Sequence, residues 1–252
     1  MLAQDTNMSL CPTLEICSLT HPGMVRAHNE DNHVVDAAGR FAILADGMGG
    51  YNAGEVASEM AVTLLAAGLS GSVPDRKLLL KTQIERSNAA IFAASQTRAE
   101  CAGMGTTLVA AMFHDNRVTV AHVGDSRLYR CRGEHLEVIT RDHSLLQEQI
   151  DGGLISREEA RMSSNKNLVT RALGVAPEVA VEVGEYPTLA GDVYLLCSDG
   201  LNDMVTDIHI QQVLLGNGSL QDRAQQLVQT ANANGGRDNV TVILVRLLQE
   251  PA

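Results

Sequence analysis

Six short apolar segments set narrow limits on how this chain can fold. Each is five to eight residues long and is bounded by glycine or polar residues, and most are rich in Val, Leu and Ala. Segments of this length and composition are typical of buried β-strands. We therefore predict strands at Phe41–Ala45, Thr107–Phe113, Arg117–Val123, Ser126–Arg132, Val193–Cys197 and Val240–Leu247.

The order of the predicted elements favours antiparallel layers. The "HDN" turn between the second and third segments is typical of a hairpin, in which neighbouring strands run antiparallel. Predicted helices at 52–69, 75–98 and 220–234 interrupt the strands without the regular alternation of a parallel doubly wound sheet, which predicts an α+β fold. On these helices we expect the buried faces to carry Val56, Met60 and Leu64, then Leu80, Ile84 and Ile91, and finally Ala224, Leu227, Val228 and Ala231.

Charge and composition argue against several classes of protein. The 252 residues include 30 acidic and 19 basic side chains, a formal charge of −11, whereas nucleic-acid binders show a basic footprint. No apolar stretch approaches the roughly 20 residues of a membrane span, and the N-terminus lacks a signal-peptide pattern. The five cysteines are odd in number and form no CxxC pair, which suits reduced thiols. We expect a cytoplasmic protein that binds neither nucleic acid nor membranes.

Acidic residues stand where the predicted strands begin or end. Asp46 and Asp199 each follow an apolar segment and precede a glycine, and Asp238 lies just before the last segment. Carboxylates at strand ends can converge on one edge of a layered sheet, where they would repel one another unless a divalent cation lay among them. Further candidates for this edge are Asp125 in a Gly-Asp corner, Asp203 one helical turn after Asp199, and Glu30 and Asp31 near Arg26.

The donor atoms in these stretches are oxygens, without a Cys/His pair at zinc spacing, and oxygen sites suit Mg²⁺ and Mn²⁺. Two such ions about 3.5–4 Å apart can hold a water as hydroxide and bind a phosphoryl group. Each acid taken alone has a simpler explanation, because an Asp-Gly pair after a strand is often a turn and helices favour acids in their first turn. The joint occurrence of several such corners favours the metal site.

Two other phosphate-binding motifs fail on the same residues. The stretch "GGYNAGE" has the spacing of a P-loop but carries Glu55 where a lysine must contact phosphate, and "GMGGYN" lacks the third glycine of a dinucleotide fingerprint. Cys197 lies beside Asp199 but lacks the arginine-rich loop of a cysteine phosphatase, so we interpret it as a core residue.

In the order and spacing of six motifs, the sequence resembles the bacterial PP2C-like (PPM) metal-dependent protein serine/threonine phosphatases. The motifs are "VRAHNEDN", "ILADGMGG", "GMGTTLVAAMF", "VAHVGDSRLYR", "LLCSDGLNDMV" and "GGRDNVTVILV", and they cover about Leu14 to Leu247. The resemblance implies a four-layer α-β-β-α sandwich with two central antiparallel sheets. It also implies a single domain over residues 1–252, with a flap inserted at about 143–176, where Ser156 and Glu159 predict a capping box.

The resemblance further implies a centre of two tightly bound Mn²⁺ or Mg²⁺ ions. Asp46 would bridge the two ions, and the carbonyl oxygen of Gly47 would contact one of them. Asp199 and Asp238 would ligate one ion, and Glu30 would lie on the side of the other.

Other positions of the family pattern concern a third ion and the substrate. Asp125 and Asp203 match positions that hold a weaker third ion, and Arg26 matches the arginine that binds the substrate phosphate. Animal members carry a histidine, thought to protonate the leaving group, where this chain has Met48. A metal-bound water is our first candidate for that acid, and His28 is the second.

The activity that the resemblance implies is hydrolysis of phosphoserine and phosphothreonine in proteins, by direct attack of a metal-bridging hydroxide. Its partners would be a bacterial serine/threonine kinase and the phosphorylated substrates of that kinase, and a monomer is expected. Two alternatives remain at this point: a hydrolase of small phosphate esters, and a PP2C-like regulatory binding module without catalysis.

Overall fold

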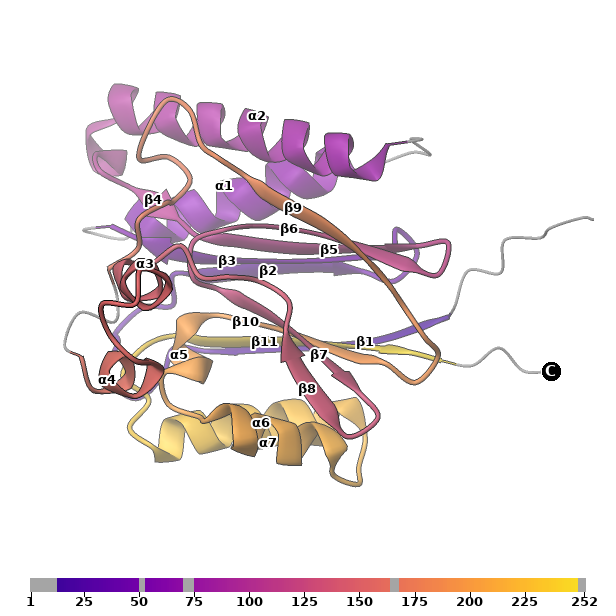
Figure 1. Cartoon of the computed structure of the whole chain (residues 1–252). Coiled ribbons are helices and arrows are strands. Elements are labelled where there is room, and N and C mark those ends of the chain that lie inside the picture. The colour runs from indigo at the N-terminus through magenta and orange to yellow at the C-terminus, as the bar shows by residue number, and fades with distance from the viewer. Residues whose placement is uncertain (1–12, 50–52, 70–74, 164–167, 249–252) are drawn as a thin grey trace, which may run out of the picture.

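The structure, a computed structural model, describes residues 13–49, 53–69, 75–163 and 168–248. Two antiparallel sheets lie face to face, and a pair of helices covers the outer face of each sheet (Figure 1). This arrangement is the predicted four-layer α-β-β-α sandwich. Of the helices in the described part of the chain, none combines the length and apolar character needed to cross a membrane.

The first sheet holds five strands and is covered by two helices near the C-terminus. In spatial order the strands are β1 (Leu14–His21), β11 (Val240–Leu247), β10 (Val193–Cys197), β7 (Arg127–Arg132) and β8 (His135–Val138). The covering helices are α6 (Asp207–Leu215) and α7 (Leu220–Ala233). All four residues predicted for the inner face of α7 are buried, and they pack against the outer side chains of β10 and β11.

The second sheet is covered by the two long helices that follow its second strand. Its main path is β2 (Asp31–Asp36), β3 (Phe41–Met48), β5 (Leu108–His114), β6 (Arg117–Val123) and β9 (Glu182–Pro187), and β4 (Gly105–Thr106) pairs with the end of β3. The covering helices are α1 (Ala53–Gly68) and α2 (Arg76–Thr97), and a short 3₁₀ helix, η1 (Ala99–Cys101), follows α2. Asp115 and Asn116 adopt φ of 41° and 56° in the β5–β6 turn, which confirms the predicted hairpin.

The central strands are apolar on both faces because both faces are covered. Ile43 and Ala45 of β3 point toward α1 and α2, whereas Ala42 and Leu44 point into the core between the sheets. Successive side chains of a strand alternate between faces, so a strand buried on both sides becomes a continuous apolar run. This is why the sequence shows unbroken apolar segments.

Helix α1 buries a different face from the predicted one. Ala57, Ala61 and Leu65 are fully buried, whereas Leu64 is 40% exposed. The small side chains of Ala57 and Ala61 let the helix lie close to the second sheet. The buried face is therefore shifted by one residue from the predicted one, which was based on the larger side chains. Asn52, the predicted cap, lies outside the described residues.

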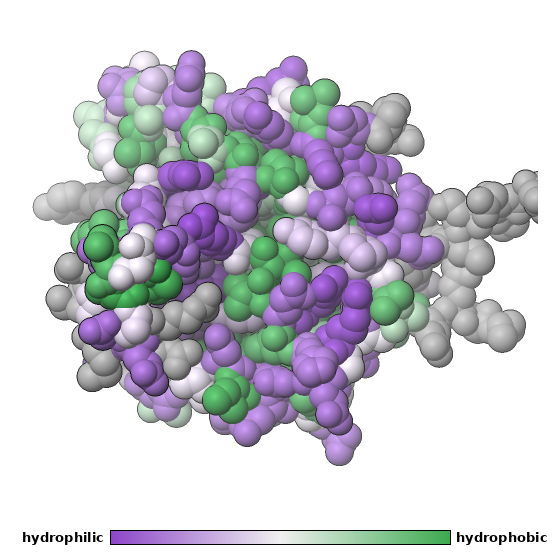
Figure 2. All heavy atoms as spheres, viewed as in Figure 1, coloured by the Kyte–Doolittle hydropathy of each residue, from purple (hydrophilic) through white to green (hydrophobic). Residues whose placement is uncertain are grey.

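The flap (residues 143–176) begins as a lobe that is closed at its base, whereas its last residues pack into the main body, where Leu173 is fully buried and pairs with Thr106 of β4. Its described part holds α3 (Leu145–Asp151) and α4 (Arg157–Met162), and the predicted capping box of Ser156 and Glu159 is present. Ser144 forms a β-bridge with Val169, and the His143 carbonyl accepts a hydrogen bond from the Thr170 amide at 2.8 Å. In Figure 2 the face shown is mostly hydrophilic, with hydrophobic side chains gathered over the flap and near the middle.

Candidate metal centre

The acidic strand ends converge on one edge of the sandwich. In the first sheet, β10 ends two residues before Asp199, β11 begins two residues after Asp238, and β7 begins two residues after Asp125. Because β10 pairs antiparallel with both β11 and β7, these three aspartates share an edge. This edge faces the flap and the short helix α5 (Asp199–Asn202) in Figure 1.

The second sheet brings two more aspartates to the same edge. Asp31 begins β2 and lies directly opposite Asp46 of β3 in the antiparallel register. Oδ2 of Asp31 accepts hydrogen bonds from the hydroxyls of Ser198, at 2.8 Å, and Thr241, at 2.7 Å. Since Ser198 directly follows β10 and Thr241 lies in β11, these two bonds join the second sheet to the first at the acidic edge.

Two glycines permit the close backbone approaches that bring the acids together. A Cβ atom on Gly47 would lie 2.2 Å from the carbonyl oxygen of Gly54 in α1, and one on Gly200 would lie 2.0 Å from the carbonyl oxygen of Asn239. No side chain fits at such distances. The Asp-Gly pairs near the end of β3 and just after β10 therefore allow tight packing next to a carboxylate, as well as a change of chain direction.

The backbone of Asp46 is held on both sides by threonines. Its amide donates to Oγ1 of Thr107 at 3.1 Å, and its carbonyl oxygen accepts from the Thr107 amide and from the Thr106 hydroxyl. The Thr107 hydroxyl also contacts that of Ser126 at 2.8 Å. These bonds fix the main chain from which the Asp46 carboxylate projects.

The electrostatics of the edge are those of crowded carboxylates. Burial raises the pKa of Asp46 well above its ordinary value, and repulsion from Asp31, Asp199, Asp125 and Asp238 raises it further. The pKa of Asp199 is raised well above its ordinary value, first by burial and then by its aspartate neighbours. Burial also raises the pKa of Asp31 to about 6, against the two hydroxyl bonds, which lower it. Each raised pKa marks a place where positive charge would be favourable.

Asp125 and Asp203 lie on the flap side of this cluster. Burial and repulsion from Asp142 raise the pKa of Asp125 to about 7, and Asp203 also raises it. Asp203 likewise contributes to the raised pKa of Asp199. These three carboxylates thus lie close enough to repel one another.

Glu30, Arg26 and Asp238 lie together on the opposite side. The Arg26 guanidinium, half exposed, donates from Nη2 to Oδ2 of Asp238 at 2.7 Å. Burial is the largest effect on the pKa of Glu30 and raises it. The nearby charge of Arg26 lowers this pKa, and that of Asp238 raises it. The Asn239 side chain ties this loop down, because its Oδ1 accepts from the Glu30 amide at 2.8 Å and its Nδ2 donates to the carbonyl oxygen of His28.

The residues at this edge fit a pair of hard divalent cations. The donors are carboxylate oxygens and backbone carbonyls, the ligands that Mg²⁺ and Mn²⁺ prefer. Oδ1 of Asp31 is buried and accepts no hydrogen bond from the described residues, so a bound cation or its water would satisfy it. Cation binding would relieve the repulsion among these closely spaced acids, which raise one another's pKa values.

The structure therefore brings the predicted site residues into one cluster, and it adds residues that the sequence did not single out. Asp31 was a candidate for this edge but was given no role of its own, yet it is buried and lies directly opposite Asp46. Ser198, Thr241 and Asn239 were not predicted at all. Thr241 could have been recognised in the sequence as a polar residue within the otherwise apolar segment of β11.

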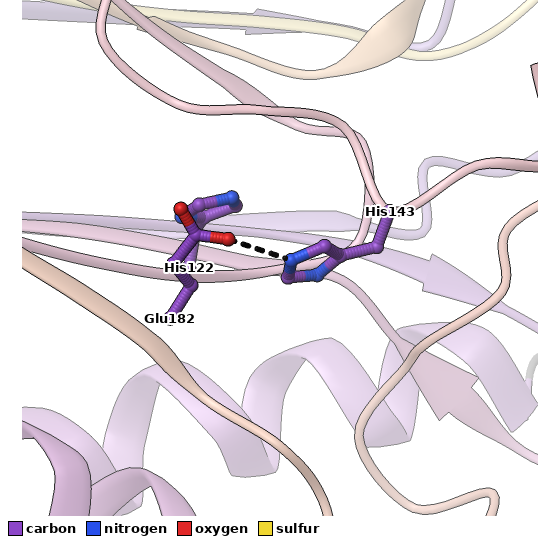
Figure 3. A group of neighbouring side chains, drawn as sticks. All are labelled: His122, His143 and Glu182. Atoms are coloured by element: carbon purple, nitrogen blue, oxygen red, sulfur yellow. Dashed lines mark hydrogen bonds and ion pairs between the residues drawn. The ribbon is translucent and has the colours of Figure 1, made fainter. Parts of the chain in front are cut away.

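A second cluster of ionisable side chains, separate from the acidic edge, lies where the flap begins. His122 of β6 and His143 stack with ring centroids 4.7 Å apart, and Glu182 lies beside them (Figure 3). Nδ1 of His143 accepts from the Gly124 amide at 3.2 Å, which places the ring proton on Nε2, 3.3 Å from Oε2 of Glu182.

This group does not suit a metal ion. Nε2 of His143 also lies 3.3 Å from Nη1 of Arg171, so a cation already occupies the approach to that nitrogen. Binding a metal there would also require the proton to move to the nitrogen that accepts from Gly124. Burial lowers the pKa of both histidines, which keeps them neutral near pH 7. We interpret the group as the contact that fixes the start of the flap to the Gly124 corner.

Cys197 is a core residue, as predicted. Its side chain is fully buried, and burial raises the pKa of the thiol to about 12. A nucleophilic cysteine needs the thiolate form at neutral pH, so this thiol is the wrong kind of group for covalent phosphate transfer.

Comparison with known proteins gives a consistent result. The family model for protein phosphatase 2C matches residues 25–244. The serine/threonine phosphatase stp of Listeria welshimeri is 40% identical over 234 residues, which cover 90% of this chain and 93% of the relative.

Solved structures agree with this match. The serine/threonine phosphatase PstP/Ppp of Mycobacterium tuberculosis superimposes with a TM-score of 0.89 at 38% identity, covering 94% of this chain and 99% of that one. The catalytic domain of PstP in complex with two manganese ions superimposes with a TM-score of 0.86 at 38% identity, with the same coverage. The chain therefore belongs to the protein phosphatase 2C family.

Proposed function

We propose that the acidic cluster around Asp46 is the catalytic centre of this metal-dependent protein serine/threonine phosphatase. The observation that carries the proposal is the convergence at one edge of carboxylates from both sheets, which lie close enough to raise one another's pKa. Such a cluster is costly for the fold unless cations bind to it. The manganese-bound PstP, which shares the fold, supports the same interpretation.

In this proposal Asp46 and the Gly47 carbonyl would hold the two main ions. Asp199 and Asp238 would be ligands of one ion, and Glu30 would serve the other. Asp125 and Asp203, which lie near Asp199 on the flap side, would hold a weaker third ion. The whole chain acts as one phosphatase domain, with the flap beside the site.

The residues of the chain prepare the reaction in three ways. Arg26 leaves Asp238 and donates hydrogen bonds to the substrate phosphate, for which a guanidinium has the right geometry. The threonine and glycine contacts fix the Asp46 backbone before the substrate arrives, so little reorganisation is needed. When bound, the ions lower the pKa of a water toward neutrality and offset phosphoryl charge. Since Cys197 is buried and protonated, the chain offers no thiolate there for a covalent route.

The substrates are phosphorylated proteins. We infer that a serine/threonine kinase with the same substrates is the opposing enzyme. We also infer a cytoplasmic location, because the four described cysteines are free thiols.

The proposal is tested by hydrolysis of matched phosphothreonine and phosphotyrosine peptides, with Mn²⁺ and with a chelator. We expect the wild type to cleave the phosphothreonine peptide with Mn²⁺ and to lose this activity with the chelator. Asp46→Ala should lose the activity at all Mn²⁺ concentrations, with an unchanged circular dichroism spectrum and weaker Mn²⁺ binding by calorimetry. Undiminished turnover by Asp46→Ala, or turnover that resists the chelator, would contradict the proposal.

A further inference from the structure

A cavity extends the acidic edge from the proposed metal centre toward the flap. It has a volume of about 330 Å³ and lies between flap helices α3 and α4 on one side and the segment from α5 to the start of α6 on the other. Asp125, Asp199 and Asp203 form part of its wall. A substrate whose phosphate lies at the metal centre would therefore place a neighbouring side chain close to this cavity, since consecutive residues are only about 3.8 Å apart.

One part of the cavity wall is apolar. Leu146, Ile150 and Ala160 contribute from the flap, and Met204 and Val205 contribute from the opposite side. This wall is suited to the methylene groups of a long side chain. The volume is at the lower end of the range for ligand pockets, so the cavity suits a side chain better than a large ligand.

The rest of the wall is polar and includes five aspartates. Asp125, Asp199 and Asp203 are the carboxylates that we assign to cations, and Asp142 is bound by Arg127 through Nε and Nη2, at 2.6 to 3.1 Å. Asp207 differs from these four. It accepts a hydrogen bond from the neutral Tyr129 hydroxyl at 3.2 Å, and Arg127 is the one cation among the described lining residues.

We propose that this cavity binds an arginine or lysine side chain of the substrate protein, close in sequence to the phosphorylated residue. The aliphatic stem of the side chain contacts Leu146, Ile150 and Val205, and its charged end lies near Asp207. Long basic side chains bury their stems against apolar surfaces in this way while the charge stays near water or an acid. The proposal rests on the proposed function and adds a substrate preference to it.

The test uses phosphothreonine peptides that differ at one position, from three residues before to three residues after the phosphothreonine. Each position carries Arg, Ala or Glu in turn, and kcat/KM is measured with the full chain and Mn²⁺. We expect Arg to be preferred over Ala by about 3- to 10-fold at one or two positions, the size of a partly exposed ion pair with additional stem contacts. Glu should be the least favourable residue at those positions.

Two variants connect this preference to the cavity. Asp207→Asn should abolish the preference for Arg while leaving turnover of the Ala peptide and of a small aryl phosphate unchanged. Ile150→Lys places a cation on the wall and should reverse the preference toward Glu, and it does not depend on the Tyr129 hydrogen bond. The matched control is Glu148→Gln, an exposed residue of α3 that is not among those lining the cavity.

The outcomes separate this inference from the proposed function. Equal turnover of all peptides, or a preference for Arg that survives in both variants, would overturn the inference and leave the phosphatase activity intact. If the aryl phosphate were hydrolysed but no phosphothreonine peptide were, the proposed action on proteins would be refuted, and this inference with it.

Discussion

Strand β10 begins directly after the buried Asp192 and ends two residues before Asp199, which is only partly buried. The Asp192 side chain is 1% exposed, and Arg132 binds both of its oxygens, at 2.7 and 2.8 Å. The Leu189 amide and the Tyr194 hydroxyl donate to the same carboxylate. Asp192 is therefore a buried charge that the protein compensates with its own residues.

Asp199, at the other end of the same strand, has acidic neighbours in place of an arginine. The neighbours that act most on its pKa are other aspartates, and all of them raise it. At Asp192 the chain supplies an arginine that compensates the charge, whereas around Asp199 it gathers further acids, where the proposal places metal ions. The two ends of β10 therefore contrast a carboxylate that stabilises the fold with one that we propose to be a metal ligand.

The largest expected effect comes from changing these two aspartates in turn. Asp199→Asn should lower Mn²⁺-dependent turnover by more than about 100-fold. Loss of a residue that only orients a metal ligand costs up to about 100-fold, and loss of a ligand itself should cost more. The metal-free variant should be at least as stable as the wild type, because repulsion is removed. Turnover of a phosphothreonine peptide and urea unfolding without metal measure the two effects.

Asp192→Asn is the matched control and should show the reverse. It weakens a buried pair and should lower the free energy of unfolding by about 1–3 kcal/mol, with kcat unchanged. If Asp192→Asn lost turnover and Asp199→Asn kept it, the proposed contrast between the two ends of β10 would be wrong.

The next effect concerns pH. The pKa of Asp31, about 6, lies above its value in an unfolded chain, so the metal-free folded state retains a proton that the unfolded state releases. This carboxyl group therefore destabilises the fold progressively as pH rises from about 4 to 7. At 1.36 kcal/mol per pKa unit, the effect is on the order of 3 kcal/mol. Mn²⁺ should reverse it, because cations bind the ionised form.

Asp31→Asn isolates this effect from the buried histidines, whose lowered pKa values act in the opposite direction. Urea unfolding of both metal-free proteins at pH 4.5, 6 and 7.5 should show the variant gaining stability relative to the wild type as pH rises. A constant difference across this range would falsify the assignment of a raised pKa to Asp31.

The smallest effect is expected at Arg26, the cation at the acidic edge that pairs with Asp238. Its side chain is half exposed, so the pair should contribute at most about 1 kcal/mol to stability. Arg26→Ala should instead raise KM for phosphothreonine peptides by about 10-fold, with a smaller change in kcat, and Arg26→Lys should restore part of the loss. Steady-state kinetics decide, and an unchanged KM would remove Arg26 from phosphate binding.

Much of the fold could be predicted because its central strands are buried on both faces. β3, β5, β6, β7, β10 and β11 all appeared as apolar segments. Apart from the two-residue β4, the missed strands are β1, β2, β8 and β9, the four edges of the two sheets. An edge strand is covered less completely, and most residues of these four are only partly buried or exposed, so polar side chains interrupt their sequences.

The site divides in a similar way. Asp46 and Asp199 carry a local signal, an apolar run followed by Asp-Gly, which sequence alone can reveal. The importance of Asp31 depends on its register opposite Asp46 and on hydroxyls from the other sheet, and no short stretch of sequence contains that information. Assignment of individual ions to these residues stays a prediction.

The β-bridge between Ser144 and Val169 has a consequence for how such proteins can diversify. The two chain ends of the flap leave the sandwich side by side, already joined by main-chain bonds. Lengthening or replacing the segment between them would add little closure entropy, because that cost grows only slowly with loop length. The flap can therefore change in length and sequence, and so in what it recognises, while the sheets and helices of the sandwich keep their architecture.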